Sequence, residues 1–166
     1  MSRVAIVSDT HVPSRERAVP DWVGDELEAA DHAIHAGDFD SQRSYERIAA
    51  LANGNLTAIR GNTDPPTLEL PHTDTFEVGG VTFAVTHGTG SPAGWQRRVV
   101  ETARVEATTA EPVVVAGHTH EVVDTAVDGV RVLNPGSATG AAPADRATMY
   151  VATVTDGELE VELRSG

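Results

Sequence analysis

The chain has 166 residues, a formal net charge of −13 and no cysteine, and all 12 of its basic residues are arginines. Without cysteine there are no disulfides and no thiolate metal sites, so any metal ion must be held by oxygen and nitrogen ligands. The large negative charge argues against long nucleic acids as partners, because their phosphates would be repelled.

The length fits one domain over 1–166 and allows a substantial hydrophobic core. No run of 18 or more apolar residues occurs, and Met1-Ser2-Arg3 leads directly into the first apolar segment. We therefore expect no membrane span, no signal peptide and a cytoplasmic location. The abundance of acids and the absence of lysine resemble proteins of halophiles, which work in concentrated salt. The alternative is an ordinary acidic protein from a GC-rich genome.

The first half of the chain alternates short apolar segments with amphipathic ones. The apolar residues 4–7 predict a strand buried on both faces. The following elements are expected to be a helix over 20–30, a strand over 33–36, a helix from Ser41 to about Ala52, and a strand over 56–59. This alternation predicts parallel strands joined by right-handed crossovers.

The second half is expected to contain three hairpins, one helix and one more buried strand. The hairpins have Gly-Gly or Asp-Gly turns and cover 75–78 with 81–86, 122–127 with 130–133, and 147–154 with 158–163. A helix opened by Ser91-Pro92 runs to about Thr108, and a strand covers 113–116. Together the elements predict an α/β fold with two mixed β-sheets packed face to face and helices outside.

Polar residues follow five of the expected strands. They are Asp9 and His11, Asp38, Asn62, His87, and His118 and His120. In extended backbone, residues two apart point to the same side, so Asp9 should converge with His11, and His118 with His120. Carboxylate, amide and imidazole groups gathered at strand ends predict a divalent-metal site. The remaining histidines, His32, His35 and His72, are predicted to be structural or surface residues.

In this order the motifs D-x-H, G-D, G-N, H and G-H-x-H resemble the signature of the calcineurin-like metallophosphoesterase superfamily. The G-N-x-D form at 61–64 and the N-P-G-S stretch at 134–137 resemble most its small, single-domain prokaryotic phosphodiesterase branch. The resemblance spans 4–137. It implies a metal-dependent phosphodiesterase that hydrolyses a small phosphodiester by attack of a metal-bridging hydroxide.

The resemblance also implies a ligand set for two divalent metal ions. Asp38 would bridge the ions, with Asp9, His11 and His120 on one and Asn62, His87 and His118 on the other; Asp38, Asn62 and His118 would be catalytic. We expect manganese first, with nickel, iron, zinc or cobalt as alternatives, because these mixed ligands suit all of them. The expected partner is a small phosphodiester, and a homo-oligomer stays open because relatives form dimers and larger assemblies.

Three positions depart from related sequences. Many superfamily members have a histidine after G-N and an aspartate three residues beyond the G-D acid, whereas this chain has Thr63 and Ser41. Small relatives often have another histidine where Thr89 stands. These departures remove the usual general acid for the leaving group and change substrate contacts, but they leave the metal ligands in place.

A non-catalytic metal-binding or protein-interaction scaffold on the same fold is the alternative function. The retromer subunit with this fold resembles the chain in architecture but has a degraded metal site, and a fold can outlive its function. All seven ligand positions are filled with competent residues in this chain, which favours an enzyme. A single structural metal is disfavoured because seven ligands exceed what one ion needs.

Overall fold

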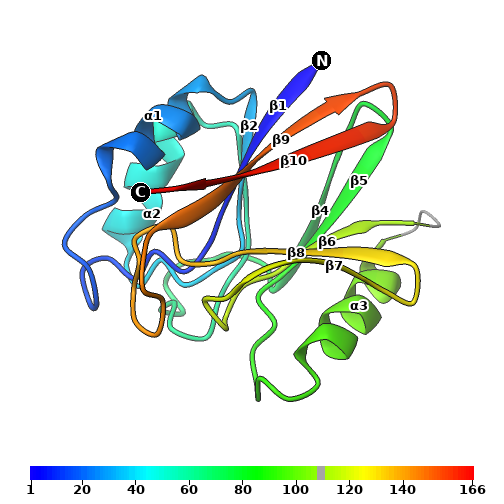
Figure 1. Cartoon of the computed structure of the whole chain (residues 1–166). Coiled ribbons are helices and arrows are strands. Elements are labelled where there is room, and N and C mark those ends of the chain that lie inside the picture. Colours follow the sequence, from blue (N-terminus) through cyan, green and yellow to red (C-terminus); the bar gives the residue numbers. More distant parts are fainter. Residues whose placement is uncertain (108–110) are drawn as a thin grey trace.

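The computed structural model describes residues 1–107 and 111–166, and Figure 1 shows its elements. The helices are α1 Asp21–Ala29, α2 Gln42–Leu51 and α3 Trp95–Glu106. The strands are β1 Ser2–Val7, β2 His32–His35, β3 Leu56–Ala58, β4 Thr73–Val78, β5 Val81–Thr86, β6 Val113–Val115, β7 Val122–Val127, β8 Val130–Pro135, β9 Thr148–Thr155 and β10 Glu158–Ser165. Within these described residues, no helix combines the length and apolarity needed to span a bilayer.

The strands form two five-stranded mixed sheets, which confirms the predicted fold class. The first sheet has the order β10-β9-β1-β2-β3 and the second has the order β4-β5-β6-β8-β7. β1, β2 and β3 run parallel, as do β5, β6 and β8, while antiparallel strands complete each sheet. The expected polar residues all lie in loops that follow the parallel strands β1, β2, β3, β5 and β6.

Three apolar layers hold the sheets and helices together. The central layer lies between the two sheets and includes Ile6, Phe83 and Leu133, each fully buried. Figure 1 shows α1 and α2 on one side of the paired sheets and α3 on the other. Leu27 of α1 and Ile48 of α2 pack on the outer face of the first sheet, and a separate cluster lies beneath α3. The helices therefore lie outside the sheets, as expected.

The third helix begins later than expected. It starts at Trp95 instead of Ser91, because Gly94 adopts a left-handed conformation with φ of 77° and interrupts the helical backbone. Ser91 instead accepts a hydrogen bond from the Ala93 N–H at 3.2 Å, within a turn. The helix ends at Glu106, and the expected end near Thr108 lies outside the described residues.

The three predicted hairpins are confirmed, and their turns show why the sequence identifies them. Both central residues of the turns have positive φ: 56° and 84° at Gly79-Gly80, 50° and 77° at Asp128-Gly129, and 47° and 80° at Asp156-Gly157. Two successive positive φ values are typical of the type I′ turn, whose twist matches that of the flanking strands. Glycine is favoured at such positions because it has no Cβ.

Candidate metal centre

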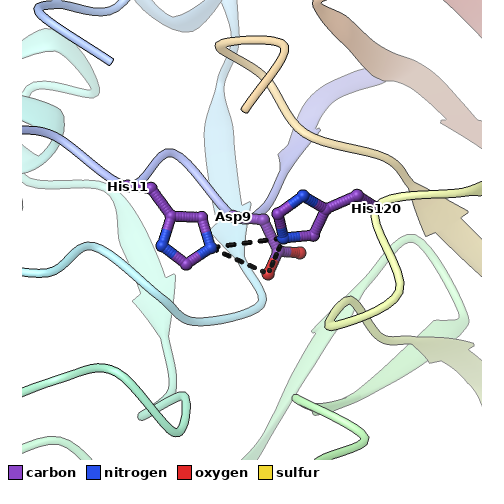
Figure 2. A group of neighbouring side chains, drawn as sticks. All are labelled: Asp9, His11 and His120. Atoms are coloured by element: carbon purple, nitrogen blue, oxygen red, sulfur yellow. Dashed lines mark hydrogen bonds and ion pairs between the residues drawn. The ribbon is translucent and has the colours of Figure 1, made fainter. Parts of the chain in front are cut away.

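The loops after β1 and β6 bring together a carboxylate and two imidazoles. Figure 2 shows Asp9, His11 and His120 pointing toward one another. The His120 Nε2 atom lies 3.4 Å from Asp9 Oδ1, and His11 Nε2 lies 3.8 Å from the same oxygen. The two Nε2 atoms are 3.2 Å apart. All three side chains are buried, so these three potential ligand atoms face one shielded point.

A second group lies beside the first. The His87 Nε2 atom is 3.0 Å from Asp38 Oδ2, and His118 Nδ1 is 3.1 Å from Asn62 Oδ1. Potential ligand atoms of Asp38, His87 and His118 all lie within 4.8 Å of one another. Asp38 and His87 are buried, whereas Asn62 is exposed. This second group therefore forms the more accessible part of the cluster.

Asp38 lies between the two groups. Its Oδ2 atom is 3.0 Å from His87 Nε2 in the second group and 3.5 Å from His11 Nε2 in the first. Asp9 Oδ1 is likewise 3.8 Å from His87 Nε2. The structure thus brings all seven side chains singled out in the sequence into one cluster, with a carboxylate at the junction of its two halves.

The predicted extended backbone at Asp9 and His11, and at His118 and His120, was wrong. β1 ends at Val7, and Asp9 and His11 have φ of 53° and 45°, so neither is in extended backbone. His118 and His120 also have positive φ, at 75° and 63°. Left-handed loop conformations, and not alternation along a strand, turn these side chains inward. Such conformations are unfavourable for non-glycine residues and cluster at functional sites.

Two glycines allow the loops to approach the carboxylates. A Cβ atom on Gly61 would overlap the carboxylate and backbone nitrogen of Asp38. One on Gly117 would overlap the Asp9 carboxylate and the Ser8 hydroxyl. A side chain at either position would displace a proposed ligand, so the G-N and G-H-x-H motifs need glycine for space.

Hydrogen bonds fix the orientation of all four clustered histidines. In each ring, the nitrogen that faces away from the cluster lies 2.7–2.9 Å from an oxygen acceptor: His11 Nδ1 from Asp40 Oδ1, His87 Nδ1 from Ala36 O, His120 Nδ1 from Ala141 O, and His118 Nε2 from Gly90 O. Carbonyl and carboxylate oxygens only accept, so that nitrogen must carry the hydrogen. In the neutral rings of His11, His87 and His120 the nitrogen facing the cluster then has a free lone pair, as metal binding requires. His118 differs, because its Nδ1 lies 3.1 Å from a second acceptor, the Asn62 amide oxygen.

The two buried carboxylates also make the cluster favourable for positive charge. Burial opposes ionisation of Asp9, but interactions with His11 and His120 outweigh it and lower its pKa. Burial likewise opposes protonation of His87, but the Asp38 and Asp9 carboxylates outweigh it and raise the pKa of His87 to about 9. Two buried carboxylates thus attract cations to this point, and a divalent metal ion competes with protons there.

The donor set fits a metal ion. The Asp9 Oδ2 atom accepts from the Ser8 hydroxyl at 2.7 Å and from the His118 N–H at 3.0 Å. Its buried Oδ1 atom has no hydrogen-bond partner, and neither has buried His87 Nε2, which lies near Asp38 but is poorly aligned with it. Unpartnered buried polar atoms are costly, and a cation at this point would satisfy both. Oxygen and imidazole ligands suit first-row divalent metals.

Asp64 has a supporting role that the sequence did not reveal. Its buried carboxylate accepts four backbone N–H bonds of 2.7–3.0 Å, from Asp38, Phe39, Asp40 and Gly61. These bonds join the loop that carries Asp38 to the loop that carries Asn62. The G-N-x-D spacing pointed to this residue but not to its hydrogen bonds, which depend on the folded loops.

Asp40 is the second supporting residue missed in the sequence. Its Oδ1 atom lies 2.9 Å from His11 Nδ1 and accepts a 2.6 Å hydrogen bond from the Thr63 hydroxyl. Asp40 therefore places a carboxylate beside Thr63. In many superfamily members the acid of this loop stands one residue later, at the position of Ser41. Ser41 instead caps α2, accepting from the Ser44 N–H at 3.1 Å.

The other three histidines lie outside the cluster. His35 is buried, stacks on Phe39 and accepts a hydrogen bond from the Gly37 N–H at 3.0 Å. His32 stacks on Phe76, and His72 is exposed. The prediction that these three are structural or surface residues agrees with their positions.

Comparison with known proteins identifies the family. Residues 2–157 match the sequence model described as the calcineurin-like phosphoesterase superfamily domain. The chain belongs to this superfamily. It is 28% identical over 162 residues to a probable metallophosphoesterase of Methanothermobacter thermautotrophicus, covering 96% of this chain and 90% of the relative. It is 31% identical over 153 residues to a phosphodiesterase of Methanocaldococcus jannaschii, covering 83% and 85% of the two chains.

Solved structures agree with this assignment at the level of fold. The Vps29 protein of Chaetomium thermophilum matches with a TM-score of 0.80, over 100% of this chain and 97% of that one. The two sequences are only 15% identical. This likeness concerns the metallophosphoesterase fold alone.

Proposed function

We propose that this member of the superfamily is a phosphodiesterase that uses two divalent metal ions to hydrolyse small phosphodiesters. The observation that carries the proposal is the pair of adjacent ligand groups with Asp38 between them, at 3.5 Å from His11 and 3.0 Å from His87. One cation needs four to six ligands, so seven convergent side chains suit two ions better than one. The identity to a named phosphodiesterase supports the reaction class.

In this proposal each ligand group would hold one ion. Asp9, His11 and His120 would hold the first, Asn62, His87 and His118 would hold the second, and Asp38 would contact both. When bound, two such ions lower the pKa of a water molecule and stabilise the charge on the attacking and leaving oxygens at phosphorus. We expect manganese first, with nickel, iron, zinc and cobalt as alternatives.

The chain itself would orient the ligands and admit the substrate. The hydrogen bonds to Asp40, Ala36 and Ala141 keep the imidazoles of His11, His87 and His120 in one tautomer, and the bond to Gly90 orients His118, which pre-organises the centre. Asn62 and Thr63 are exposed, so the diester would enter beside the second group. The Thr63 hydroxyl donates to Asp40 and has no useful pKa for protonating a leaving group at neutral pH. Good leaving groups should therefore react fastest.

The test is hydrolysis of bis-p-nitrophenyl phosphate after metal is removed with a chelator and the protein is dialysed. We expect turnover to return when Mn²⁺ is added at high salt. Asp38→Asn should lower the rate at least about 100-fold, as expected for loss of a principal electrostatic group. Asp156→Asn is the matched control, because it removes the same charge from an exposed turn at the β9–β10 hairpin.

Two outcomes would contradict the proposal. One is no turnover with manganese, nickel, cobalt, iron or zinc in protein that has bound the ion, which would favour the scaffold function. The other is equal activity of the Asp38→Asn variant and the wild type, which would place the reaction elsewhere.

A further inference from the structure

A small cavity lies beside the candidate metal centre, where α3 approaches β4 and β5. Its volume is about 260 Å³, and His87 and Gly88 form part of its wall. His87 is also one of the proposed metal ligands, so the metal centre and the cavity share this residue. The cavity therefore lies next to the candidate metal centre, with His87 at their common wall.

As far as the structure describes the chain, this cavity is lined by two arginines, Arg60 and Arg98, and two histidines, His72 and His87, with no Asp or Glu. The whole chain, in contrast, has 25 acidic and 12 basic residues. A larger cavity of about 790 Å³ between α1 and α2 has a mixed lining, which contains three arginines and three acids, Asp21, Asp25 and Glu28. The smaller cavity is thus locally positive on an acidic protein, which favours an anionic ligand.

Hydrogen-bond donors in this cavity are available to a ligand. Within residues 1–107 and 111–166, the half-buried Arg60 side chain has no hydrogen-bond or ion-pair partner. Arg98 is held in place because its Nη2 donates to Gly88 O at 3.0 Å and to Ser91 O at 2.9 Å. Four threonines line the wall, and the hydroxyl of Thr102 donates to Arg98 O, while those of Thr73, Thr86 and Thr89 add hydroxyl groups to the cavity.

We propose that this cavity binds a second anionic group of the substrate, a terminal phosphate. Guanidinium groups form paired, charge-assisted hydrogen bonds with phosphate oxygens, and hydroxyls complete the recognition. The inference rests on the proposed phosphodiesterase function and names the class of substrate more closely. The preferred substrates are small diesters that carry a phosphate monoester in addition to the bond to be hydrolysed, such as a 5′-phosphorylated dinucleotide.

The first experiment measures phosphate binding without turnover. Inorganic phosphate is titrated into the metal-stripped full chain at fixed ionic strength and followed by ³¹P NMR, so that binding to metal ions does not contribute. We expect Arg60→Gln to weaken binding about 10-fold, the loss expected for one charged hydrogen bond of roughly 1.5 kcal/mol. Arg97→Gln is the control, because Arg97 is exposed on α3 and outside the cavity. No binding by the wild type, or equal binding by Arg60→Gln, would overturn the proposal.

The second experiment compares a dinucleotide with and without a 5′-phosphate as substrates of the manganese-loaded enzyme. The phosphorylated substrate should have a KM about 10-fold lower, and Arg60→Gln should abolish this difference. Equal KM values for the two substrates in the wild type would overturn the terminal-phosphate site and leave the phosphodiesterase function intact. If neither substrate is hydrolysed, the proposed function fails, and the phosphate titration alone decides whether the cavity binds phosphate.

Discussion

Asp64 connects the loop that carries Asp38 to the loop that carries Asn62, through four backbone N–H bonds. Asp64→Asn keeps the size of the side chain but removes its charge and one acceptor oxygen. At least two buried N–H groups would then lack an acceptor, and each such loss costs about 1–3 kcal/mol. We expect the free energy of unfolding to fall by at least about 2 kcal/mol.

Urea denaturation of metal-stripped Asp64→Asn, compared with Asp156→Asn, measures this effect. The Asp156 variant should stay within about 0.5 kcal/mol of the wild type, because the residue is exposed and asparagine tolerates its φ of 47°. A similarly small change in Asp64→Asn would contradict the supporting role assigned to this carboxylate.

His35 should make the protein sensitive to acid. Its burial lowers its pKa to about 3, because the charged form would lose water and the Nδ1 acceptor of the Gly37 N–H bond. Below about pH 6.5 the histidine of the unfolded chain binds a proton, whereas that of the folded chain stays neutral. Stability contributed by this residue is thus present above about pH 6.5 and falls as the pH drops toward 3, by up to about 1.4 kcal/mol per pH unit.

The variant His35→Gln should remove that dependence. Unfolding free energies of metal-stripped wild type and variant, measured in urea at pH 6.5, 5.5 and 4.5, would show a steeper decline in the wild type. Parallel pH dependences would mean that His35 is protonated in the folded protein, contrary to its buried position and hydrogen bonds.

At this scale the sequence predicts ligand identity better than supporting contacts. Asp9, His11 and the other proposed ligands could be singled out because their residue types and spacing are specific. Asp40 and Asp64 could not be assigned roles, because their partners are backbone groups and side chains brought near only by the loops of the fold. Their hydrogen bonds have no local sequence signature.

At the scale of elements, local rules identify the hairpins and fail at the start of α3. The hairpin turns need two successive positive φ values, for which Asp-Gly and Gly-Gly are favoured, so their positions follow from sequence. Ser91-Pro92 resembles a helix start, but Gly94 places a left-handed residue just before the helix. Boundaries of this kind depend on the balance between alternative caps and are hard to predict locally.

The start of α3 is hydrogen-bonded to the loop that carries His118 and His120. Trp95 donates from Nε1 to Gly117 O at 3.0 Å, just before His118. Trp95→Phe removes this buried hydrogen bond and some volume, and we expect a loss of about 1–2 kcal/mol in unfolding free energy. Gly117 O keeps two donors, Asn134 Nδ2 at 3.2 Å and the Thr119 N–H at 3.0 Å, which limits the effect.

Thermal or urea unfolding of Trp95→Phe should be compared with Trp22→Phe. Trp22 is half-buried on α1 and its indole has no hydrogen-bond partner among the described residues, so the same substitution there removes only packing. Equal destabilisation by the two substitutions would contradict the role assigned to the Trp95 hydrogen bond.

At the scale of the whole molecule, the candidate metal centre joins the two sheets. Asp9, His11 and Asp38 follow strands of the first sheet, while His87 and His120 follow strands of the second. Sequence periodicity predicts two mixed sheets but not the strand order, in which β9 lies beside β1 and β8 lies between β6 and β7. Such pairings join distant segments, and no local pattern specifies them.

The net charge of −13 predicts a stabilising effect of salt. Repulsion among exposed acids destabilises the compact chain, and screening shortens its range to roughly 3 Å at 1 M salt. If the composition is an adaptation to high salt, the melting temperature of metal-stripped protein should rise between about 0.1 M and 2 M KCl. A melting temperature that is constant or falls over this range would contradict the halophilic interpretation and would not affect the enzymatic one.

The most direct test of a dinuclear phosphodiesterase is a titration of metal-stripped protein with Mn²⁺ in which bound metal and hydrolysis of bis-p-nitrophenyl phosphate are measured at each step. We predict that turnover rises until two ions are bound per chain and then stays constant. Because Asp38 is the proposed shared ligand, Asp38→Asn should bind fewer than two ions and remain at least about 100-fold slower at every point. Full activity with one bound ion per chain, or two bound ions without hydrolysis, would contradict the account.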